Sequence, residues 1–144
     1  MGRVLVVDDD HSTVEAMARL LGQDGHEVQA FTSGKEAVAA VQSGHAFDVV
    51  ITDFEMPVVD GAAVTRAARE SSPTACIVVT NRGVADRNRL EDDGACLVLE
   101  KPLEYEAMHR AIAACRAAGG HAGPRCARRC PGVWDELVAL HRRR

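Results

Sequence analysis

Aromatic residues and long hydrophobic segments are both scarce in this chain of 144 residues. Phe, Trp and Tyr together make up 3% of the sequence, so a hydrophobic core has to be built mainly from Val, Leu, Ile, Ala and Met. No segment approaches the ~20 consecutive apolar residues that a membrane-spanning helix requires. We therefore expect an aliphatic core and no membrane span.

The N-terminus lacks the long apolar stretch of a secretory signal peptide, because its first apolar run, Val4–Val7, leads directly into acids. Cysteine occurs five times, an odd number that does not allow every thiol to pair within the chain. Cys76, Cys96 and Cys115 lie in apolar segments and are expected to be small buried side chains. These features together predict a cytoplasmic protein with reduced thiols.

Charge is distributed unevenly along the chain, whose formal net charge is −4. The first 120 residues hold 11 Lys and Arg against 19 acids, whereas residues 121–144 hold six arginines and two acids. An acidic body of this kind argues against a core that binds nucleic acid. The length is that of one domain with little left over.

Five short apolar segments have the character of β-strands. They are Val4–Val7, Val28–Phe31, Val49–Thr52, Cys76–Thr80 and Cys96–Leu99. Most are continuously apolar rather than alternating, which is typical of strands buried on both faces of a parallel sheet. Segments with the apolar spacing of helices separate them. This alternation, repeated five times, predicts an α/β fold with a doubly wound, five-stranded parallel sheet.

Helix boundaries are indicated by capping residues and glycines. Ser12, followed by Glu15 three residues later, is typical of a capping box at the start of the first helix. Gly25 and Gly44 are predicted to lie just after the first and second helices. The fourth predicted helix, around Ala85–Asp93, is polar and only weakly periodic.

Polar side chains lie where the predicted strands end. They are Asp8, Asp9 and Asp10 after the first strand, Asp53 after the third, Thr80 at the end of the fourth, and Lys101 after the fifth. The carboxyl ends of parallel strands meet at one edge, where ligands bind in such sheets. Clustered carboxylates need a cation, and oxygen ligands favour Mg²⁺. Because Lys and Thr can bind phosphoryl oxygens and a carboxylate can act as nucleophile, these are the parts of an aspartyl-phosphate site.

Four motifs resemble those of the response-regulator receiver family. They are Val4–Asp10, Asp53–Gly61 with the sequence DFEMPVVDG, Val78–Thr80 and Leu99–Pro102. One such motif alone would be weak, but the four occur in the family's order and at similar separations over about residues 2–118. The resemblance implies a flavodoxin-like (βα)5 fold with strand order 2-1-3-4-5.

The resemblance also implies where the phosphoryl group and the metal would bind. Asp53 would be the phosphoacceptor. Asp9 would bind Mg²⁺ directly, with Asp8 beside it acting partly through water. Asp53 itself and the backbone carbonyl of Glu55 would be further ligands of the ion.

The remaining site residues would hold the phosphoryl group and respond to it. By the same resemblance, Lys101 would pair with phosphoryl oxygens, and its bond to Pro102 is often cis in this family. Thr80 would bind the phosphoryl group and move on activation. Val98 stands where receivers usually carry Tyr or Phe, the aromatic ring that swings inward when the Thr moves, so this chain lacks that ring.

The function that follows from the resemblance is two-component signal transduction. A histidine kinase or a histidine phosphotransfer protein would donate the phosphoryl group, and phosphorylation would shift an equilibrium that changes protein contacts. The domain would be a phosphoacceptor that assists its own phosphotransfer and dephosphorylation, rather than an enzyme. Glu55 and Arg82 would flank the path of the attacking water, and we hypothesise that they slow phosphoryl loss. The alternatives are a receiver-like docking module without phosphorylation and a receiver fragment of a longer regulator.

The receiver domain is expected to cover residues 1–118, followed by a basic, linker-like tail over residues 119–144. Within the tail, Val133–His141 could form a short helix with apolar residues on one side. Cys126 and Cys130 hint at zinc, but structural sites use tighter, paired spacing. The tail is interpreted as a solvated or partner-docking segment. Alternatively, its apolar side could fold back onto the domain or mediate homodimer contacts. We do not expect nucleic-acid binding, and a DNA-binding regulator is kept as a third class.

Overall fold

The chain forms alternating strands and helices in the computed structural model, which describes residues 2–44, 47–71, 75–80, 97–101 and 105–118. The elements are β1 (Arg3–Val7), α1 (His11–Gln23), β2 (Glu27–Phe31), α2 (Gly34–Gln42), β3 (Val49–Asp53), α3 (Gly61–Ser71), β4 (Ala75–Thr80), β5 (Leu97–Glu100) and α5 (Tyr105–Ala118). Each of the five predicted strands is confirmed to within one residue at either end. The fourth predicted helix, around Ala85–Asp93, lies outside the described residues.

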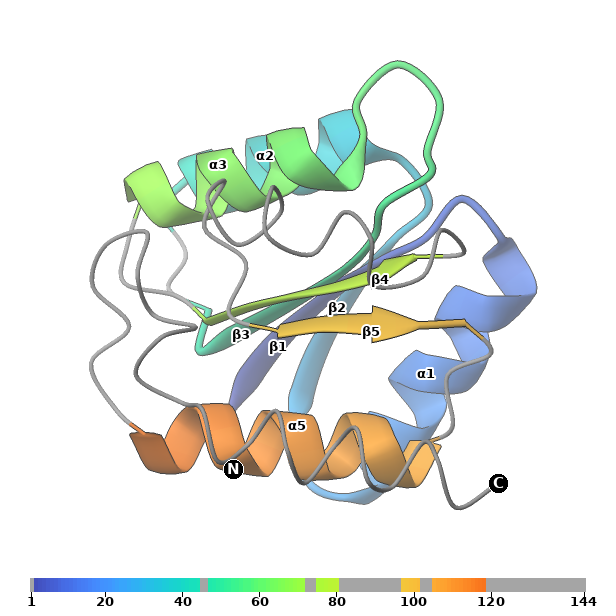
Figure 1. The fold of residues 1–144 in the computed structure, drawn as a ribbon, viewed down its shortest axis with the longest axis vertical. Coiled ribbons are helices and arrows are strands. Elements are labelled where there is room, and N and C mark those ends of the chain that lie inside the picture. Colours follow the sequence, from blue (N-terminus) through green and yellow to red (C-terminus); the bar gives the residue numbers. More distant parts are fainter. Residues whose placement is uncertain (1, 45–46, 72–74, 81–96, 102–104, 119–144) are drawn as a thin grey trace.

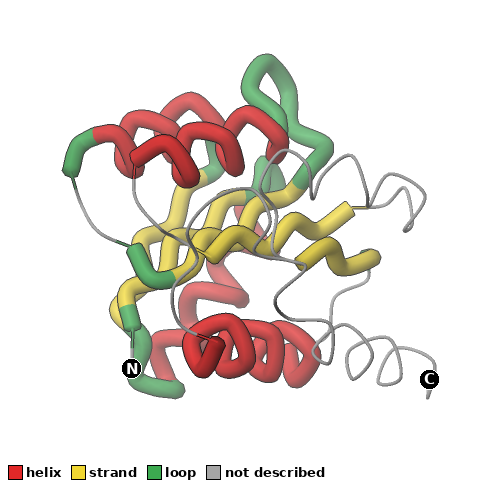
Figure 2. The backbone as a smooth tube through the Cα atoms, turned by 60° about the vertical axis from the view of Figure 1, so that its left-hand side comes forward, coloured by secondary structure: helices red, strands yellow, loops and turns green. Residues whose placement is uncertain are grey.

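All five strands are parallel and form one sheet in the order β2-β1-β3-β4-β5. Helices α2 and α3 cover one face of the sheet, and α1 and α5 cover the other (Figure 1). Figure 2 shows the same three layers from a second direction, with the strands between two layers of helix. The predicted fold class and strand order are both confirmed, so the carboxyl ends of all strands lie along one edge.

The hydrophobic core is divided by the sheet into two clusters. In β1, Val4 and Val6 belong to the cluster that includes Met108 and Ile112 of α5. Leu5 and Val7 point to the other cluster, which includes Val64 of α3 and Val41 of α2. Because helices cover both faces of the sheet, neither set of alternate side chains is exposed to water, and the strand is apolar throughout. Burial of each such side chain contributes about 1.5–3 kcal/mol to folding.

The start of α1 differs from its prediction. Ser12 is inside the helix, and the N-cap is Asp10, whose carboxylate accepts hydrogen bonds from Ser12 N at 3.1 Å and Thr13 Oγ1 at 2.9 Å. Glu15 lies 3.8 Å from His11 Nε2 instead of closing a capping box. An Asp side chain caps at least as well as Ser, and here the cap lies two residues earlier than the Ser–Glu pair indicated.

The remaining fold predictions concern glycines, cysteines and membrane spans. Gly25 and Gly44 adopt positive φ values of 90° and 92° just after α1 and α2, as predicted. Cys76 is buried, while Cys96 lies outside the described residues and the side chain of Cys115 is not described. Across the described ranges, none of the helices combines the length and apolar character needed to span a bilayer.

Candidate functional site

The sheet brings three carboxylates together at its carboxyl edge. Asp8 follows β1, Asp9 comes next, and Asp53 is the last residue of β3 at the centre of the sheet. Oxygens of these three side chains all lie within 4.8 Å of one another. The cluster follows from the strand topology. Because β1 and β3 are parallel neighbours, the residues at their carboxyl ends lie side by side although they are far apart in sequence.

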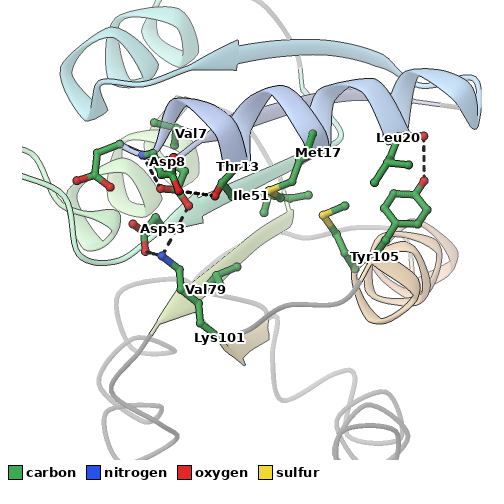
Figure 3. Close-up of a pocket in the computed structure, with 14 residues that line it drawn as sticks. Val7, Asp8, Thr13, Met17, Leu20, Ile51, Asp53, Val79, Lys101 and Tyr105 are labelled. Carbon is green, nitrogen blue, oxygen red and sulfur yellow. Dashed lines mark hydrogen bonds and ion pairs between the residues drawn. The ribbon is translucent and has the colours of Figure 1, made fainter. Parts of the chain in front are cut away.

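Lys101, which directly follows the edge strand β5, completes the cluster. Its Nζ lies 2.9 Å from Asp53 Oδ1 and 3.7 Å from Asp8 Oδ2 (Figure 3). The Asp53 side chain is 2% exposed and that of Lys101 is 26% exposed. The contact is an ion pair rather than an aligned hydrogen bond, since Asp53 Oδ1 accepts none within the described part of the chain.

Burial and mutual repulsion disfavour the charged form of the clustered carboxylates. Burial raises the pKa of Asp53 to about 6, with Lys101 opposing this shift and the charges of Asp8 and Glu55 adding to it. Burial also raises the pKa of Asp8. Burial disfavours the Lys101 ammonium, yet Asp53, Asp8 and Glu55 together raise the pKa of Lys101 above its usual value. One ammonium is therefore shared among several carboxylates, a donor set that suits a hard divalent cation.

The three consecutive acids after β1 have different roles. Asp9 is exposed at the cluster, and Asp8 Oδ1 accepts a hydrogen bond of 2.9 Å from the backbone N–H of Asp10. Asp10 instead uses its carboxylate to cap α1, and its hydrogen bond to Thr13 holds the pKa of Asp10 below its usual value. Asp8 and Asp9, the two that the sequence assigned to the metal site, lie with Asp53, and Asp10 does not.

Thr80 and Glu55 meet across the site through a contact that sequence reasoning missed. Thr80, at the end of β4, is 1% exposed and donates a hydrogen bond from its Oγ1 to Glu55 Oε1 at 2.6 Å. Each residue was a predicted site residue, but nothing in the sequence paired them. Arg82, the predicted partner of Glu55, lies outside the described residues, as does Pro102.

The loop between β3 and α3 is held in place next to Asp53 by backbone hydrogen bonds. Phe54 N donates to Val79 O at 2.8 Å, and Gly61 N donates to Phe54 O at 3.0 Å. A Cβ on Gly61 would come within 2.5 Å of Asp53 O, so the close approach requires glycine. In the same loop Val58 is fully exposed and has a φ of 68°, a strained conformation for a β-branched residue.

Val98 occupies the predicted position of the missing aromatic ring. It lies in β5 opposite Val78 and is 2% exposed, packed in the cluster between the sheet, α1 and α5. Val98 therefore fills a core position with a small branched side chain. A ring that changes between buried and exposed positions is absent from this strand of the described structure.

A pocket of about 690 Å³ begins at the acidic cluster and continues along α1. Figure 3 shows Asp8, Asp53 and Lys101 at one end of it, and Leu20 and Tyr105 at the other. At that far end the Tyr105 hydroxyl donates to Leu20 O at 3.1 Å and also to Asp24. These contacts join the end of α1 to the beginning of α5.

The five-stranded parallel sheet carries three clustered aspartates and a lysine at its carboxyl edge. This arrangement defines a class of α/β domains suited to binding a divalent cation and a phosphoryl group. The family model for the response regulator receiver domain matches residues 4–113. The chain belongs to the response regulator receiver family, as its motifs predicted.

Individual relatives agree with this assignment. The chain is 35% identical over 119 residues to the transcriptional regulatory protein TcrA of Mycobacterium tuberculosis, covering 81% of this chain and 47% of TcrA. It is 32% identical to the hybrid signal transduction histidine kinase L of Dictyostelium discoideum, covering 84% of this chain and 8% of the kinase. The chain thus spans about half or less of the length of these relatives.

Solved receiver domains have the same fold. A response regulator receiver domain protein from Clostridium thermocellum is 30% identical, with a TM-score of 0.73 over 80% of this chain and 94% of that one. The response regulator TrrA of Thermotoga maritima, solved in complex with Mg²⁺ and BeF, is 25% identical, with a TM-score of 0.71 over 80% and 99% of the two chains.

Proposed function

We propose that this receiver domain accepts a phosphoryl group on Asp53, in a site that also binds Mg²⁺. The observation that carries the proposal is the cluster itself: three carboxylates within 4.8 Å of one another, with the Lys101 ammonium 2.9 Å from Asp53. Of the clustered carboxylates, Asp53 is the one on the central strand and the most buried. It is therefore the nucleophile best shielded from water.

The metal-ligand chemistry of the cluster fits magnesium. The ion would be held by carboxylate oxygens of Asp8, Asp9 and Asp53 and by the backbone carbonyl oxygen of Glu55. Bound Mg²⁺ would neutralise charge on the transferring phosphoryl group. The raised pKa values of Asp53 and Asp8 support this assignment, because burial, their largest cause, disfavours the charged carboxylates and a bound cation would offset that cost.

The protein's own side chains would position the phosphoryl group. An Asp53 carboxylate oxygen forms the bond to phosphorus while the bond from phosphorus to the donor histidine breaks, and the electron pair stays on the imidazole nitrogen. Lys101 holds the carboxylate before transfer and phosphoryl oxygens after it. Thr80 would bind another phosphoryl oxygen, for which its hydroxyl must leave Glu55.

The cellular role follows from this chemistry. The donor would be a histidine kinase or a histidine phosphotransfer protein in the cytoplasm, and the phosphorylated domain would change its protein contacts. The domain would also assist the hydrolysis of its own acyl phosphate, with Glu55 restricting the attacking water. Residues 1–118 would form the receiver and residues 119–144 a separate tail.

Intact mass after incubation with a small-molecule phosphodonor tests the proposal. The full chain should gain one phosphoryl group in the presence of Mg²⁺ and none in EDTA, and Asp53→Asn should gain none. Asp9→Asn should reduce labelling at least tenfold by weakening the metal site. Asp10→Asn is the matched control, because Asn also caps helices and Asp10 lies outside the cluster.

A different result would favour another function. If wild type shows no adduct with either a small donor or a histidine kinase and binds no Mg²⁺ by calorimetry, the phosphoacceptor proposal is wrong. The chain would then act as a receiver-like docking module. Labelling that persists in Asp53→Asn would place the acceptor at another residue.

A further inference from the structure

The pocket that starts at the acceptor site is also a groove with two chemically different ends, here called the α1–α5 groove. Its acidic end is formed by Asp8, Asp9 and Asp10, and its apolar end by Met17, Leu20 and Met108. Figure 3 shows Met17 and Leu20 on the side of α1 that faces α5, away from the acids. An elongated cavity of about 690 Å³ is large enough to receive several side chains of a peptide segment.

The two ends of the groove leave both apolar surface and negative charge uncovered. Met17 and Leu20 are only half-buried on α1, although both face the groove. At the acidic end, the carboxylates of the cluster and of Asp10 are opposed within the groove by one cation, Lys101. A fitting occupant would therefore be apolar at one end and basic at the other.

One segment of this chain has that order of residues. Val133, Trp134, Leu137 and Leu140 are spaced as one side of a helix, and Arg142, Arg143 and Arg144 follow directly. Residues 121–144 carry an excess of four positive charges, whereas the first 120 residues carry an excess of eight negative charges. We propose that residues 133–144 dock in the α1–α5 groove, with the apolar side on Met17 and Leu20 and the arginines beside the acids.

The connection is long enough to allow this docking. Helix α5 ends at Ala118 and, with 14 residues, is about 21 Å long. Residues 119–132 can span up to ~46 Å when extended, about twice the length of α5. As a helix, residues 133–144 would be about 18 Å long, close to the ~15 Å between Asp10 and Leu20 along α1. Because the segment is tethered, its effective concentration near the groove would be in the millimolar range, so a weak contact suffices.

Docking would give the tail a role in controlling the acceptor site. Arginines beside Asp8 and Asp9 would compete with Mg²⁺ for the same carboxylates and restrict access to Asp53. This regulatory consequence rests on the proposed function, but the docking itself does not, because it needs only the groove and the tail.

Methionine-methyl NMR of the full, unphosphorylated chain tests the docking directly. Trp134 is the only tryptophan, and Met17 and Met108 line the groove. We expect NOEs from the Trp134 indole to the methyl group of Met17. Met108 is 1% exposed and should report the docking through a change in its chemical shift. Met56 is an internal control, since it belongs to the opposite core cluster and should show no such NOE.

Tail variants provide the comparison, because they leave the described fold untouched. Leu137→Asp combined with Leu140→Asp should abolish the NOEs and shift the Met17 and Met108 methyl signals. Replacement of Arg142, Arg143 and Arg144 by Ser should raise acrylamide quenching of Trp134 at least twofold. The same variant should bind Mg²⁺ at least twofold more tightly.

Two results would overturn the proposal. One is a wild-type spectrum in which the Met17 and Met108 signals match those of the Leu137→Asp, Leu140→Asp variant. The other is NOEs that appear only between differently labelled copies in a mixed sample, which would place the tail on a second chain. Neither result depends on whether Asp53 accepts phosphate.

Discussion

Asp53 is buried at the centre of the sheet with its pKa raised to about 6, and this makes its carboxylate a source of instability in the metal-free protein. Between the unfolded pKa near 3.8 and the folded value, the folded state binds more protons than the unfolded state. Stability therefore falls as the pH rises through this window, and the cost is fully present above pH 6.

Asp53→Asn is predicted to stabilise the protein in EDTA by roughly 2 kcal/mol at pH 7. The gain should disappear as the pH falls toward 4, because both proteins then carry a neutral group at this position. Urea denaturation of the two proteins at several pH values measures the difference. Addition of Mg²⁺ should stabilise wild type more than the variant, and an equal effect on both would contradict the placement of the ion at Asp53.

Val58 is the second residue with a measurable energetic cost. A non-glycine residue held at positive φ costs of order 1–3 kcal/mol. Replacement by glycine would relieve this strain, but the greater chain entropy of glycine in the unfolded state would cancel part of the stabilisation. We expect Val58→Gly to raise the free energy of unfolding by about 1 kcal/mol. Val58→Ala keeps most of the strain and should have a smaller effect in the same denaturation experiment.

The identities of the site residues could be predicted from the sequence, but their contacts could not. Asp8, Asp53 and Lys101 were recognisable because each directly follows an apolar strand, and strand ends converge in any parallel sheet. The bond between Thr80 and Glu55 depends on side-chain direction across two strand ends, which no spacing rule contains. The same is true of Asp10, because three consecutive acids look equivalent until the first turn of α1 selects one as its cap.

At the level of elements, the join between β3 and α3 determines where Asp53 points. Gly61→Ala would place a methyl group 2.5 Å from Asp53 O and 2.8 Å from Phe54 Cα, so the backbone has to move. We expect a loss of about 2 kcal/mol in stability and weaker Mg²⁺ binding. Gly22→Ala in α1 is the matched control, since nothing lies within 4 Å of the added carbon, and it should stabilise by about 0.5–1 kcal/mol. Thermal melts and calorimetric Mg²⁺ titrations of both variants distinguish them.

The elements themselves were largely predictable because their patterns are local. Continuous apolar runs identified the strands, and Gly25 and Gly44 identified the residues after α1 and α2. The predicted N-terminal boundary of α1 was wrong, since Ser12 and Glu15 matched a capping pattern but Asp10, two residues earlier, is the actual N-cap. Local rules rank such alternatives poorly when both are acceptable.

At the scale of the whole molecule, Tyr105 joins α5 to α1. Its hydroxyl donates to Leu20 O and to Asp24, and burial followed by the hydrogen bond to Asp24 raises the pKa of Tyr105 to about 12. The stabilisation is present below the unfolded pKa near 10 and is lost as the pH rises toward 12. Tyr105→Phe should therefore cost about 1 kcal/mol at pH 8, and the difference from wild type should shrink above pH 10. Urea denaturation at pH 8, 10 and 11 measures this trend, and a constant difference would contradict it.

The topology also determines when a newly made chain becomes competent. Asp53 is synthesised well before Lys101, and the two meet only after β4 and β5 have been added to the sheet. A nascent chain that has emerged only through β3 has its carboxylates but lacks the ammonium and hydroxyl that complete the site. Under the proposed function, an unfinished or truncated copy would be unable to accept phosphate and divert it from finished copies, so the order of the strands would act as a checkpoint on translation as well as a scaffold for chemistry.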